Sequence, residues 1–207
     1  MSKTICLALT GASGMPYGLR LLECLLEADC NVQLLYSQAA QIVARQEMDL
    51  ELPSRPADAR DLLLARLAGT NAAVNPKKLA IFGREEWFAP VASGSNPPDA
   101  MVICPCSMGT LAAIAQGLSD NLIERAADVV LKEGSKLVLV PRETPFSAIH
   151  LENMLRLSRA GAVILPPSPG FYHHPQSVQD IVDFVVARVL DQIAVPHTLM
   201  QRWGEDR

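Results

Sequence analysis

Two short segments rich in small and hydroxyl-bearing residues are the first candidates for ligand binding. The first covers residues 10–14 (TGASG) and the second residues 104–110 (CPCSMGT). Each follows an apolar run and opens a helix-like stretch, and a helix N-terminus presents free N–H groups to an anion. For residues 10–14 alone, a tight strand-to-helix turn is an equally good explanation. If the two preceding strands are neighbours in a parallel sheet, both turns face one crevice, which favours a shared ligand site.

The residues around these turns favour FMN over a dinucleotide. The G-x-G-x-x-G motif of dinucleotide sites is absent from residues 10–14. The second apolar run ends in Tyr36, Ser37 and Gln38, with no acidic residue to hold a nucleotide ribose. A smaller phosphorylated ligand such as FMN suits both facts. Ser37 is interpreted as a hydroxyl contact to that ligand, as a helix N-cap, or as both.

The cysteines of the second turn are interpreted as core residues and not as metal ligands. The sequence holds no further closely spaced cysteine pair, and no histidine stands at ligand spacing from Cys104 and Cys106. Cys104 is therefore expected to be a buried thiol. No metal is expected at this site.

Four basic residues could hold a phosphate group. Arg125 and Lys132 lie seven residues apart in a helical pattern and therefore share one helix face. Arg142 directly follows a predicted strand, and Arg188 lies among apolar residues of the last predicted helix. Most lysine and arginine side chains are simply solvated. Arg142 and Arg188 depart from that default, and a phosphate clamp explains both positions.

A buried ion pair explains Arg142 and Arg188 equally well, with Glu143 or Asp183 as the partner. Glu143 lies beside Arg142 at the end of a predicted strand, where a carboxylate could act as a general acid or base. The other interpretation of Glu143 is an ion-pair partner that orients an arginine. The sequence leaves both interpretations open.

Two irregular segments could close a pocket. Residues 166–175 (PPSPGFYHHP) are stiffened by proline and are expected to place Tyr172 over the crevice as a lid, with the two histidines on the surface. Residues 83–98 contain Trp87 and Phe88, which one domain buries with difficulty. These rings are expected to pack against another subunit and help to close an apolar pocket. A small hydrophobic cluster beneath a long loop is the alternative.

These candidates need a scaffold that gathers strand ends, and the chain alternates short apolar runs with helix-like stretches. The runs are almost continuously apolar, which indicates strands buried on both faces. The alternation predicts the α/β class, with a Rossmann-like, doubly wound parallel sheet flanked by helices in a single domain. That domain is expected over residues 1–207, with a C-terminal tail from about residue 195. The predicted strands cover residues 5–9, 32–36, 79–82, 101–104, 137–140 and 162–165.

The predicted helices connect these strands. They cover residues 15–28, 38–47, 61–67 and 107–116, with a last helix around residues 181–189. Ser177 and Asp180 are spaced as a capping box at the start of that last helix. His150 lies in a further helical stretch and is interpreted as structural.

Composition argues against several other functions. The 207 residues carry a net charge of -4, and 5% of them are aromatic. A nucleic-acid-binding protein would show a basic excess or stacking aromatics. Five cysteines in a chain of this length favour reduced thiols, and hence the cytoplasm, over a secreted disulfide framework. No run approaches 18 apolar residues, so no membrane span is expected.

Taken together, these segments closely resemble the UbiX flavin prenyltransferase family. The matching stretches are TGASGMPYGLRLLE from residue 10, ASGS from residue 92, CPCSMGTLAAIAQGLSDNLIERAADVVLKE from residue 104, LVLVPRETPFSAIHLENMLRLSRAGAVILPPSPGFYHHPQS from residue 137 and DFVVARVLD from residue 183. They extend through most of the chain, and residues 47–78 are the least diagnostic. The resemblance implies a Rossmann-like enzyme with reduced FMN lying across the strand ends.

The resemblance also implies roles for individual residues. The positions that match the family's FMN contacts are Gly11, Ala12, Ser13, Ser37, Ser107, Met108, Gly109, Thr110 and Arg142. The positions implied to be catalytic are Glu143, an active-site carboxylate, Ser13, which relays or orients a proton, and the basic residues Arg125 and Lys132.

The second substrate implied by the resemblance is dimethylallyl monophosphate. Tyr172 and Arg188 match its phosphate-binding residues, and Lys132 matches a further basic position near it. Trp87 and Ala92 match the loop that forms the pocket between subunits. The implied site therefore draws on more than one copy of the chain.

The family reaction joins the dimethylallyl carbon to the central-ring nitrogen of the flavin and releases phosphate, and a second bond to the neighbouring benzenoid carbon closes a fourth ring without a metal. A cationic clamp stabilises the departing phosphate. An apolar pocket shelters an allyl-cation-like species from water. Family members form large homo-oligomers, commonly dodecamers. Their product is the cofactor of a separate UbiD-type decarboxylase, in ubiquinone synthesis or a related pathway.

Three alternative functions compete with prenyl transfer. Flavin-dependent cysteine decarboxylases depend on a histidine near the flavin, and the first turn and helix here contain none. Direct decarboxylation of aromatic acids is a weaker enzymatic alternative. A non-catalytic FMN-binding regulatory or scaffold protein is expected to have lost the basic clamp. All the basic clamp residues are present, which favours an enzyme.

Overall fold

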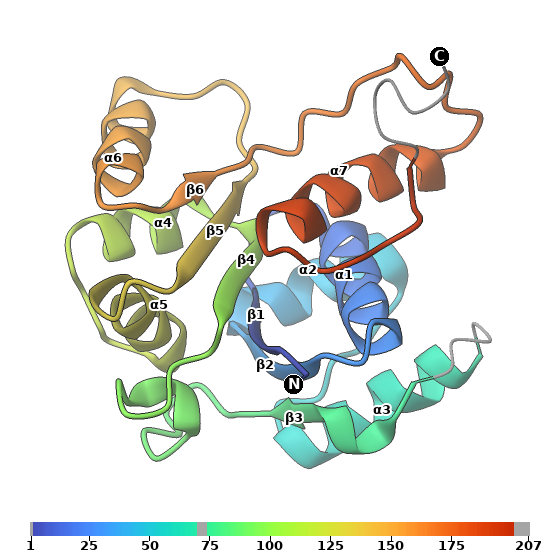
Figure 1. The fold of residues 1–207 in the computed structure, drawn as a ribbon, viewed down its shortest axis with the longest axis horizontal. Coiled ribbons are helices and arrows are strands. Elements are labelled where there is room, and N and C mark those ends of the chain that lie inside the picture. Colours follow the sequence, from blue (N-terminus) through green and yellow to red (C-terminus); the bar gives the residue numbers. More distant parts are fainter. Residues whose placement is uncertain (1, 70–73, 201–207) are drawn as a thin grey trace.

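The computed structural model describes residues 2–69 and 74–200, which form a single α/β domain around one parallel sheet (Figure 1). The strand order is β3-β2-β1-β4-β5-β6, and every neighbouring pair is parallel. This is the order of a doubly wound Rossmann-type sheet. The strands are β1 (Thr4–Leu9), β2 (Asn31–Tyr36), β3 (Leu79–Ile81), β4 (Ala100–Cys106), β5 (Lys136–Pro141) and β6 (Val163–Ile164).

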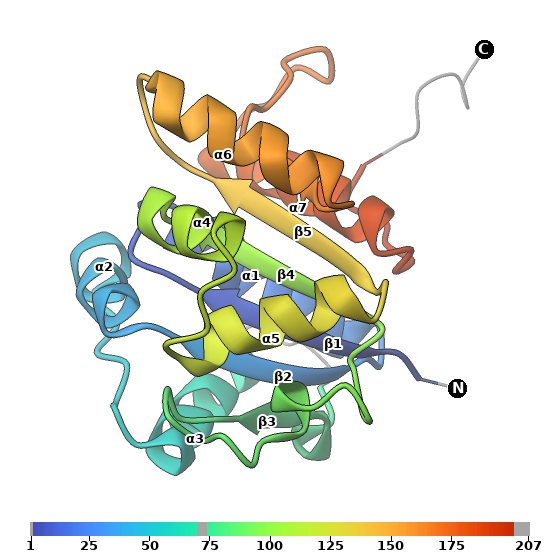
Figure 2. The same cartoon turned by 90° about the vertical axis from the view of Figure 1, so that its left-hand side faces the viewer.

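In the described residues, seven α-helices flank the sheet. Figure 2 shows from the side that they cover both of its faces. One face carries α1 (Met15–Glu27), α2 (Gln38–Met48), α3 (Pro56–Ala68) and α7 (Val178–Gln192). The opposite face carries α4 (Met108–Ala115), α5 (Leu122–Lys132) and α6 (Ala148–Arg159). Each face of the sheet carries its own hydrophobic core, and successive strand residues point into alternate cores. Ile5 and Leu7 pack in the core beneath α1, α2, α3 and α7, whereas Cys6 and Ala8 pack in the core beneath α4, α5 and α6.

Local sequence explains where the helices begin. Serine or asparagine side chains cap several of them: the Ser37, Ser107, Asn121, Ser147 and Ser177 side chains accept hydrogen bonds from the first turn of the helix that follows. The predicted capping box of Ser177 and Asp180 is present. A second capping box joins Ser147 to His150, which confirms a structural role for that histidine.

Helix α1 lies unusually close to the sheet, and Gly18 permits this. A Cβ added at Gly18 would lie 2.5 Å from the Cys104 carbonyl oxygen and 2.6 Å from Leu9 Cδ2. Real side chains do not tolerate such distances, so only glycine fits between α1 and the neighbouring strands β1 and β4. This close seating sets the position of the turn that opens α1.

The predicted class, the six strands and the adjacency of β1 and β4 are confirmed. Most boundaries differ by a residue or so, and three differences bear on the site or are larger. Strand β4 continues through Cys106, because Thr10 N donates to Pro105 O (3.2 Å) and Arg142 N donates to Cys106 O (3.3 Å). Helix α3 begins at Pro56 and not near residue 61, and β6 is two residues long. No helix in the described part of the chain is long and apolar enough to cross a membrane.

Candidate functional site

The two hydroxyl-rich turns meet at the carboxyl edge of the sheet, as the sequence predicted. Thr10 joins them: its hydroxyl donates to Pro105 O (2.8 Å) and accepts from Ser107 N (2.8 Å). The Thr10 side chain is buried, so these bonds act in a water-poor setting. The first turn is therefore fixed directly to the start of α4, and the two segments form one continuous rim.

The serines of this rim are oriented by the helices that they cap. Ser37 Oγ accepts from Ala40 N (3.1 Å), and Ser107 Oγ accepts from Thr110 N (3.3 Å). Both side chains are half-buried, so the capping role is confirmed and a ligand contact stays a prediction. A Cβ added at Gly109 would meet nothing within 4 Å, so the first turn of α4 is open on that side.

The N-terminus of α1 differs from the expectation of free N–H groups. The carboxylate of Glu47, from the end of α2, accepts from Gly14 N (3.0 Å) and Met15 N (2.8 Å). Gly14 has no side chain to cap this helix, and a carboxylate suits the positive end of the helix dipole. Sequence reasoning missed Glu47, because no local pattern shows that the end of α2 folds back onto α1.

Arg142 and Glu143 follow β5 beside this rim, yet they do not pair with each other. Within residues 2–69 and 74–200, the Arg142 side chain makes no hydrogen bond or ion pair and is exposed. Glu143 Oε1 accepts from Thr144 N at 3.1 Å. The interpretation of Glu143 as the ion-pair partner of Arg142 is wrong. Among the described residues, neither side chain forms an ion pair, so both charges remain available to a ligand at the strand end.

Arg125 and Lys132 share one face of α5, as predicted, and residues 92–95 lie along that face. Arg125 Nε donates to Ala92 O (3.0 Å), and its Nη1 pairs with Asp128 (2.8 Å). Lys132 Nζ pairs with Glu133 and lies against the backbone of Gly94. The two cations are thus held at fixed positions against the loop that precedes β4.

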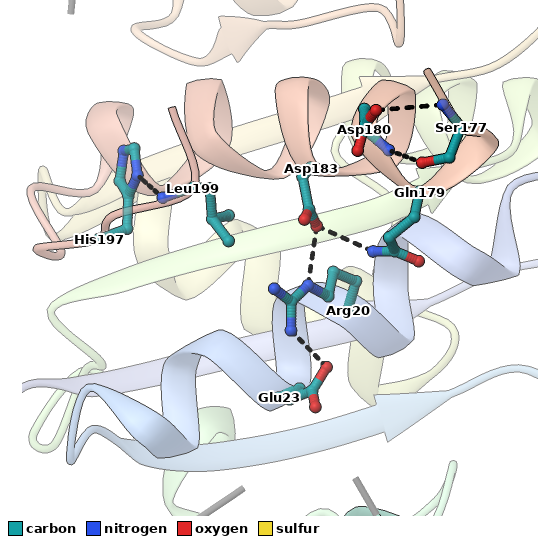
Figure 3. Close-up of polar contacts among 8 residues, drawn as sticks. All are labelled: Arg20, Glu23, Ser177, Gln179, Asp180, Asp183, His197 and Leu199. Atoms are coloured by element: carbon teal, nitrogen blue, oxygen red, sulfur yellow. Dashed lines mark hydrogen bonds and ion pairs between the residues drawn. The ribbon is translucent and has the colours of Figure 1, made fainter. Parts of the chain in front are cut away.

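For Arg188 the interpretation as one half of a buried ion pair with Asp183 or Glu143 is wrong, and its role in binding phosphate stays a prediction. Its side chain is 50% exposed on the outer face of α7, and it pairs with Asp191 (2.7 Å). Asp183 instead accepts from Arg20 of α1 at 2.8 Å (Figure 3). The apolar residues around Arg188 in sequence belong to the opposite, buried face of the helix, since sequence neighbours on a helix point in different directions.

One chain does not bring the predicted basic residues together. Helix α5 packs on one face of the sheet and α7 on the other, so Lys132 and Arg188 lie on opposite sides. Lys132 ends α5 shortly before β5 begins, and Arg188 lies near the end of α7, where Lys3 Nζ donates to Ile193 O (2.9 Å). Both cations therefore lie toward the amino edge, away from the hydroxyl-rich rim.

The aromatic residues of the two irregular segments face outward. Phe88 is fully exposed, and Trp87, Phe171 and Tyr172 are exposed as well. The alternative of a hydrophobic cluster beneath the loop is wrong for Phe88. His173 and His174 lie on the surface as predicted, and His173 stacks on Phe184 with the ring centres 5.3 Å apart.

The cysteine thiols are core groups. All five are free and buried, which confirms the interpretation of Cys104. Burial raises the pKa of Cys6 and of Cys106 to about 12 and raises the pKa of Cys104 as well. A thiol with a raised pKa is a poor nucleophile at neutral pH, so the site offers no activated cysteine.

Residues 1–190 match the Flavoprotein family. Over 201 residues the chain is 58% identical to the flavin prenyltransferase UbiX of Pseudomonas aeruginosa, covering 97% of this chain and 94% of the relative. The chain belongs to the UbiX family of flavin prenyltransferases. Its expected enzyme class and function, flavin prenyl transfer, are thereby confirmed.

Solved UbiX structures agree with the fold. A crystal structure of AnUbiX (PadA1) in complex with FMN and dimethylallyl pyrophosphate is 39% identical, with a TM-score of 0.85 over 100% of both chains. A dodecameric FMN-dependent Ubix-like decarboxylase from Escherichia coli O157:H7 is 44% identical, with a TM-score of 0.81 over 97% of this chain and 98% of that one. UbiX relatives therefore share the whole architecture described above.

Proposed function

We propose that this enzyme transfers a dimethylallyl group from dimethylallyl monophosphate to reduced FMN, with FMN bound on the rim at the carboxyl edge of the sheet. The observation that carries the proposal is the pair of hydrogen bonds by which the Thr10 hydroxyl, in the first turn, joins Pro105 O and Ser107 N of the second turn. These bonds make one continuous, hydroxyl-lined edge at the point where the strand order reverses, between β1 and β4, which is where ligands bind in open α/β sheets.

The residues of this rim fit the flavin. FMN would be held by Gly11, Ala12, Ser13, Ser37, Ser107, Met108, Gly109, Thr110 and Arg142. The open side of α4 at Gly109 leaves room for close approach, and the exposed Arg142 guanidinium suits an anionic group. When bound, the reduced flavin supplies the nucleophilic nitrogen that accepts the prenyl carbon. Glu143 and Ser13 would hold or move the proton at the reacting edge.

The clamp for the departing phosphate is assembled from different copies of the chain. Lys132 and Arg188 lie on opposite faces of one sheet, so a single phosphate meets both only where copies come together. Fully exposed Phe88, with Trp87 and Tyr172, supplies apolar surface for such contacts. A homo-oligomer, a dodecamer by analogy with the Escherichia coli relative, meets this requirement.

Within that assembly each group has a defined task. Arg125, Lys132, Arg188 and Tyr172 would bind the phosphate and stabilise the charge that it gains as the carbon–oxygen bond breaks. Trp87 and Ala92 would wall the pocket and exclude water, which would otherwise capture the allylic carbon. The phosphate would then leave the basic residues and carry its negative charge with it, and the prenylated flavin would remain on the rim.

The proposal also covers the setting of the enzyme. Residues 1–207 act as one flavoprotein domain with a tail from about residue 195, in the cytoplasm. The reaction requires no metal. A UbiD-type decarboxylase uses the product, in ubiquinone synthesis or a related pathway.

The decisive experiment is an anaerobic incubation of the protein with reduced FMN and dimethylallyl monophosphate, followed by mass spectrometry of the released flavin. A gain of one C5 isoprenyl unit is expected. The diphosphate donor, tested in parallel, distinguishes the two leaving groups. Unmodified FMN from protein that binds both ligands would refute the proposal and favour a decarboxylase or a non-catalytic flavoprotein.

A second measurement tests Glu143. Glu143→Gln should slow prenyl transfer and leave FMN binding unchanged, because the amide keeps the shape and loses the titratable proton. Unchanged turnover would remove Glu143 from the mechanism.

A further inference from the structure

Arg188 is the end of a chain of hydrogen bonds that begins beyond α7. Leu199 N donates to His197 Nδ1 (3.4 Å), and His197 Nε2 donates to Asp191 Oδ1 (3.2 Å). The other carboxylate oxygen, Asp191 Oδ2, accepts from Arg188 Nη1 (2.7 Å). Figure 3 shows the first of these contacts, between Leu199 and His197. One carboxylate thus links the segment after α7 to the guanidinium.

His197 is held firmly enough to act as the anchor of this chain. Its side chain is only 13% exposed. The segment that carries it is tied to the core by the buried residues Ile193 and Val195 and by Lys3, whose Nζ donates to two carbonyls at the end of α7. Because Nδ1 accepts a hydrogen bond, the proton of the neutral ring lies on Nε2 and points at Asp191.

This geometry pre-organises the guanidinium. Asp191 engages one nitrogen of Arg188 and leaves the rest of the planar fork available for a phosphate. A half-exposed arginine without such a partner would sample many rotamers and lose that freedom on binding, which weakens affinity. The same carboxylate carries a negative charge that would repel a phosphate. Orientation and repulsion therefore predict opposite effects of removing it.

We infer that Asp191, held by His197, is a positioning residue that raises the affinity of Arg188 for the phosphate of the prenyl donor. The inference rests on the proposed role of Arg188 in binding that phosphate. On this inference, the segment that follows α7 orients the Arg188 guanidinium, which one copy of the chain contributes to the site of another.

The test compares Asp191→Ala, His197→Ala and His197→Gln in the full-length enzyme. The assay is the anaerobic prenylation reaction, with the KM and kcat for dimethylallyl monophosphate and the Kd for FMN measured separately. Asp191→Ala should raise the KM for the donor about fivefold, which is the change in affinity that corresponds to the loss of a well-formed, partly exposed ion pair. The kcat and the Kd for FMN should change little. His197→Ala should raise the KM by a smaller factor. His197→Gln keeps an N–H donor near the position of Nε2, so its KM for the donor should return to that of the unmodified enzyme.

A double-mutant cycle separates positioning from general damage. In an Arg188→Ala background, the Asp191→Ala change should have no further effect on the KM, because its partner is gone. Asp58→Ala is the matched control, since Asp58, in the first turn of α3, pairs at the same i,i+3 spacing with the exposed Arg55 that directly precedes this helix. It should leave all three constants unchanged.

Each contrary outcome has a distinct meaning. A lower KM in Asp191→Ala would show that repulsion dominates and would overturn the inference. An equal rise in the KM with Arg188 already removed would overturn it too. An unchanged KM in Arg188→Ala, with prenylated FMN still formed, would remove Arg188 from the phosphate site and the inference with it. Absence of prenylated FMN from the unmodified enzyme would refute the proposed function itself.

Discussion

Gly18 provides a direct test of how α1 is seated against the sheet. In an open helix, alanine is about 1 kcal/mol more favourable than glycine. At Gly18 an added methyl carbon would lie 2.5 Å from the carbonyl oxygen of Cys104, roughly 0.8 Å closer than such atoms normally approach. That oxygen belongs to the backbone of a central strand and cannot turn aside. Overpacking against it should cost about 3 kcal/mol, the upper part of the usual range, so Gly18→Ala should destabilise the fold by about 2 kcal/mol.

Thermal unfolding measures this loss. For a domain of this size, about 2 kcal/mol corresponds to a decrease of roughly 4–8 °C in the unfolding midpoint, compared at equal protein concentration. Because α1 starts at the turn of residues 10–14, its displacement should also weaken FMN binding, which quenching of flavin fluorescence would report. The two effects should occur together.

Gly109→Ala is the matched control for Gly18→Ala. The same substitution in the first turn of α4 meets no atom within 4 Å, so helix propensity should dominate. Without FMN, it should raise stability by up to about 1 kcal/mol. If both substitutions stabilise the protein, the steric argument for Gly18 is refuted.

Three further predictions follow from named contacts. Glu47→Ala should lower stability by about 1–2 kcal/mol, through the lost cap and charge at α1, and Glu47→Gln should lose less; equal midpoints in thermal unfolding would contradict this. The backbone N–H of Gln176, together with the cap of Ser177, holds the pKa of Asp180 below its ordinary value of 3.8. The ionised Asp180 side chain should therefore contribute its full stabilisation above the ordinary pKa and lose it as the pH falls through the lower pKa of the folded state. The thermal unfolding midpoints of Asp180→Asn and the unmodified protein should differ near about pH 6 and converge in strong acid. All five buried thiols should resist a disulfide reagent near about pH 8 until unfolding, and a fast-reacting thiol would contradict their burial.

Much of the fold was predictable from the sequence, because the relevant signals are local. The apolar runs of the strands are nearly uninterrupted, and the N-capping serines precede their helices directly. Resemblance to a known family added the function, which the comparisons confirm. The end of β4 was misplaced, because the residues from Cys104 to Cys106 read as a turn until their ladder bonds to neighbouring segments are seen.

The partners of charged residues were the least predictable feature. Asp183 lies five residues from Arg188, yet it bonds to Arg20 of another helix, where side chains of 23% and 19% exposure form a tie between α1 and α7 (Figure 3). Glu47 reaches the start of α1 although it is more than 30 residues away in sequence. Such pairs depend on which helices meet, and helix packing is not encoded within any short window.

The sequence by itself determined the class of the sheet, the residue types of the hydroxyl-rich rim and the family, since each depends on local pattern or on similarity along the chain. Only the tertiary structure decided how these residues are grouped. It joined the two turns through Thr10, filled the N-terminus of α1 with Glu47, and placed Lys132 and Arg188 on opposite faces of one sheet. The physical reason is that a doubly wound sheet places the helices of its two halves on opposite faces, and α7 returns to the face of α1, so basic residues of α5 and α7 are separated by the sheet within one chain.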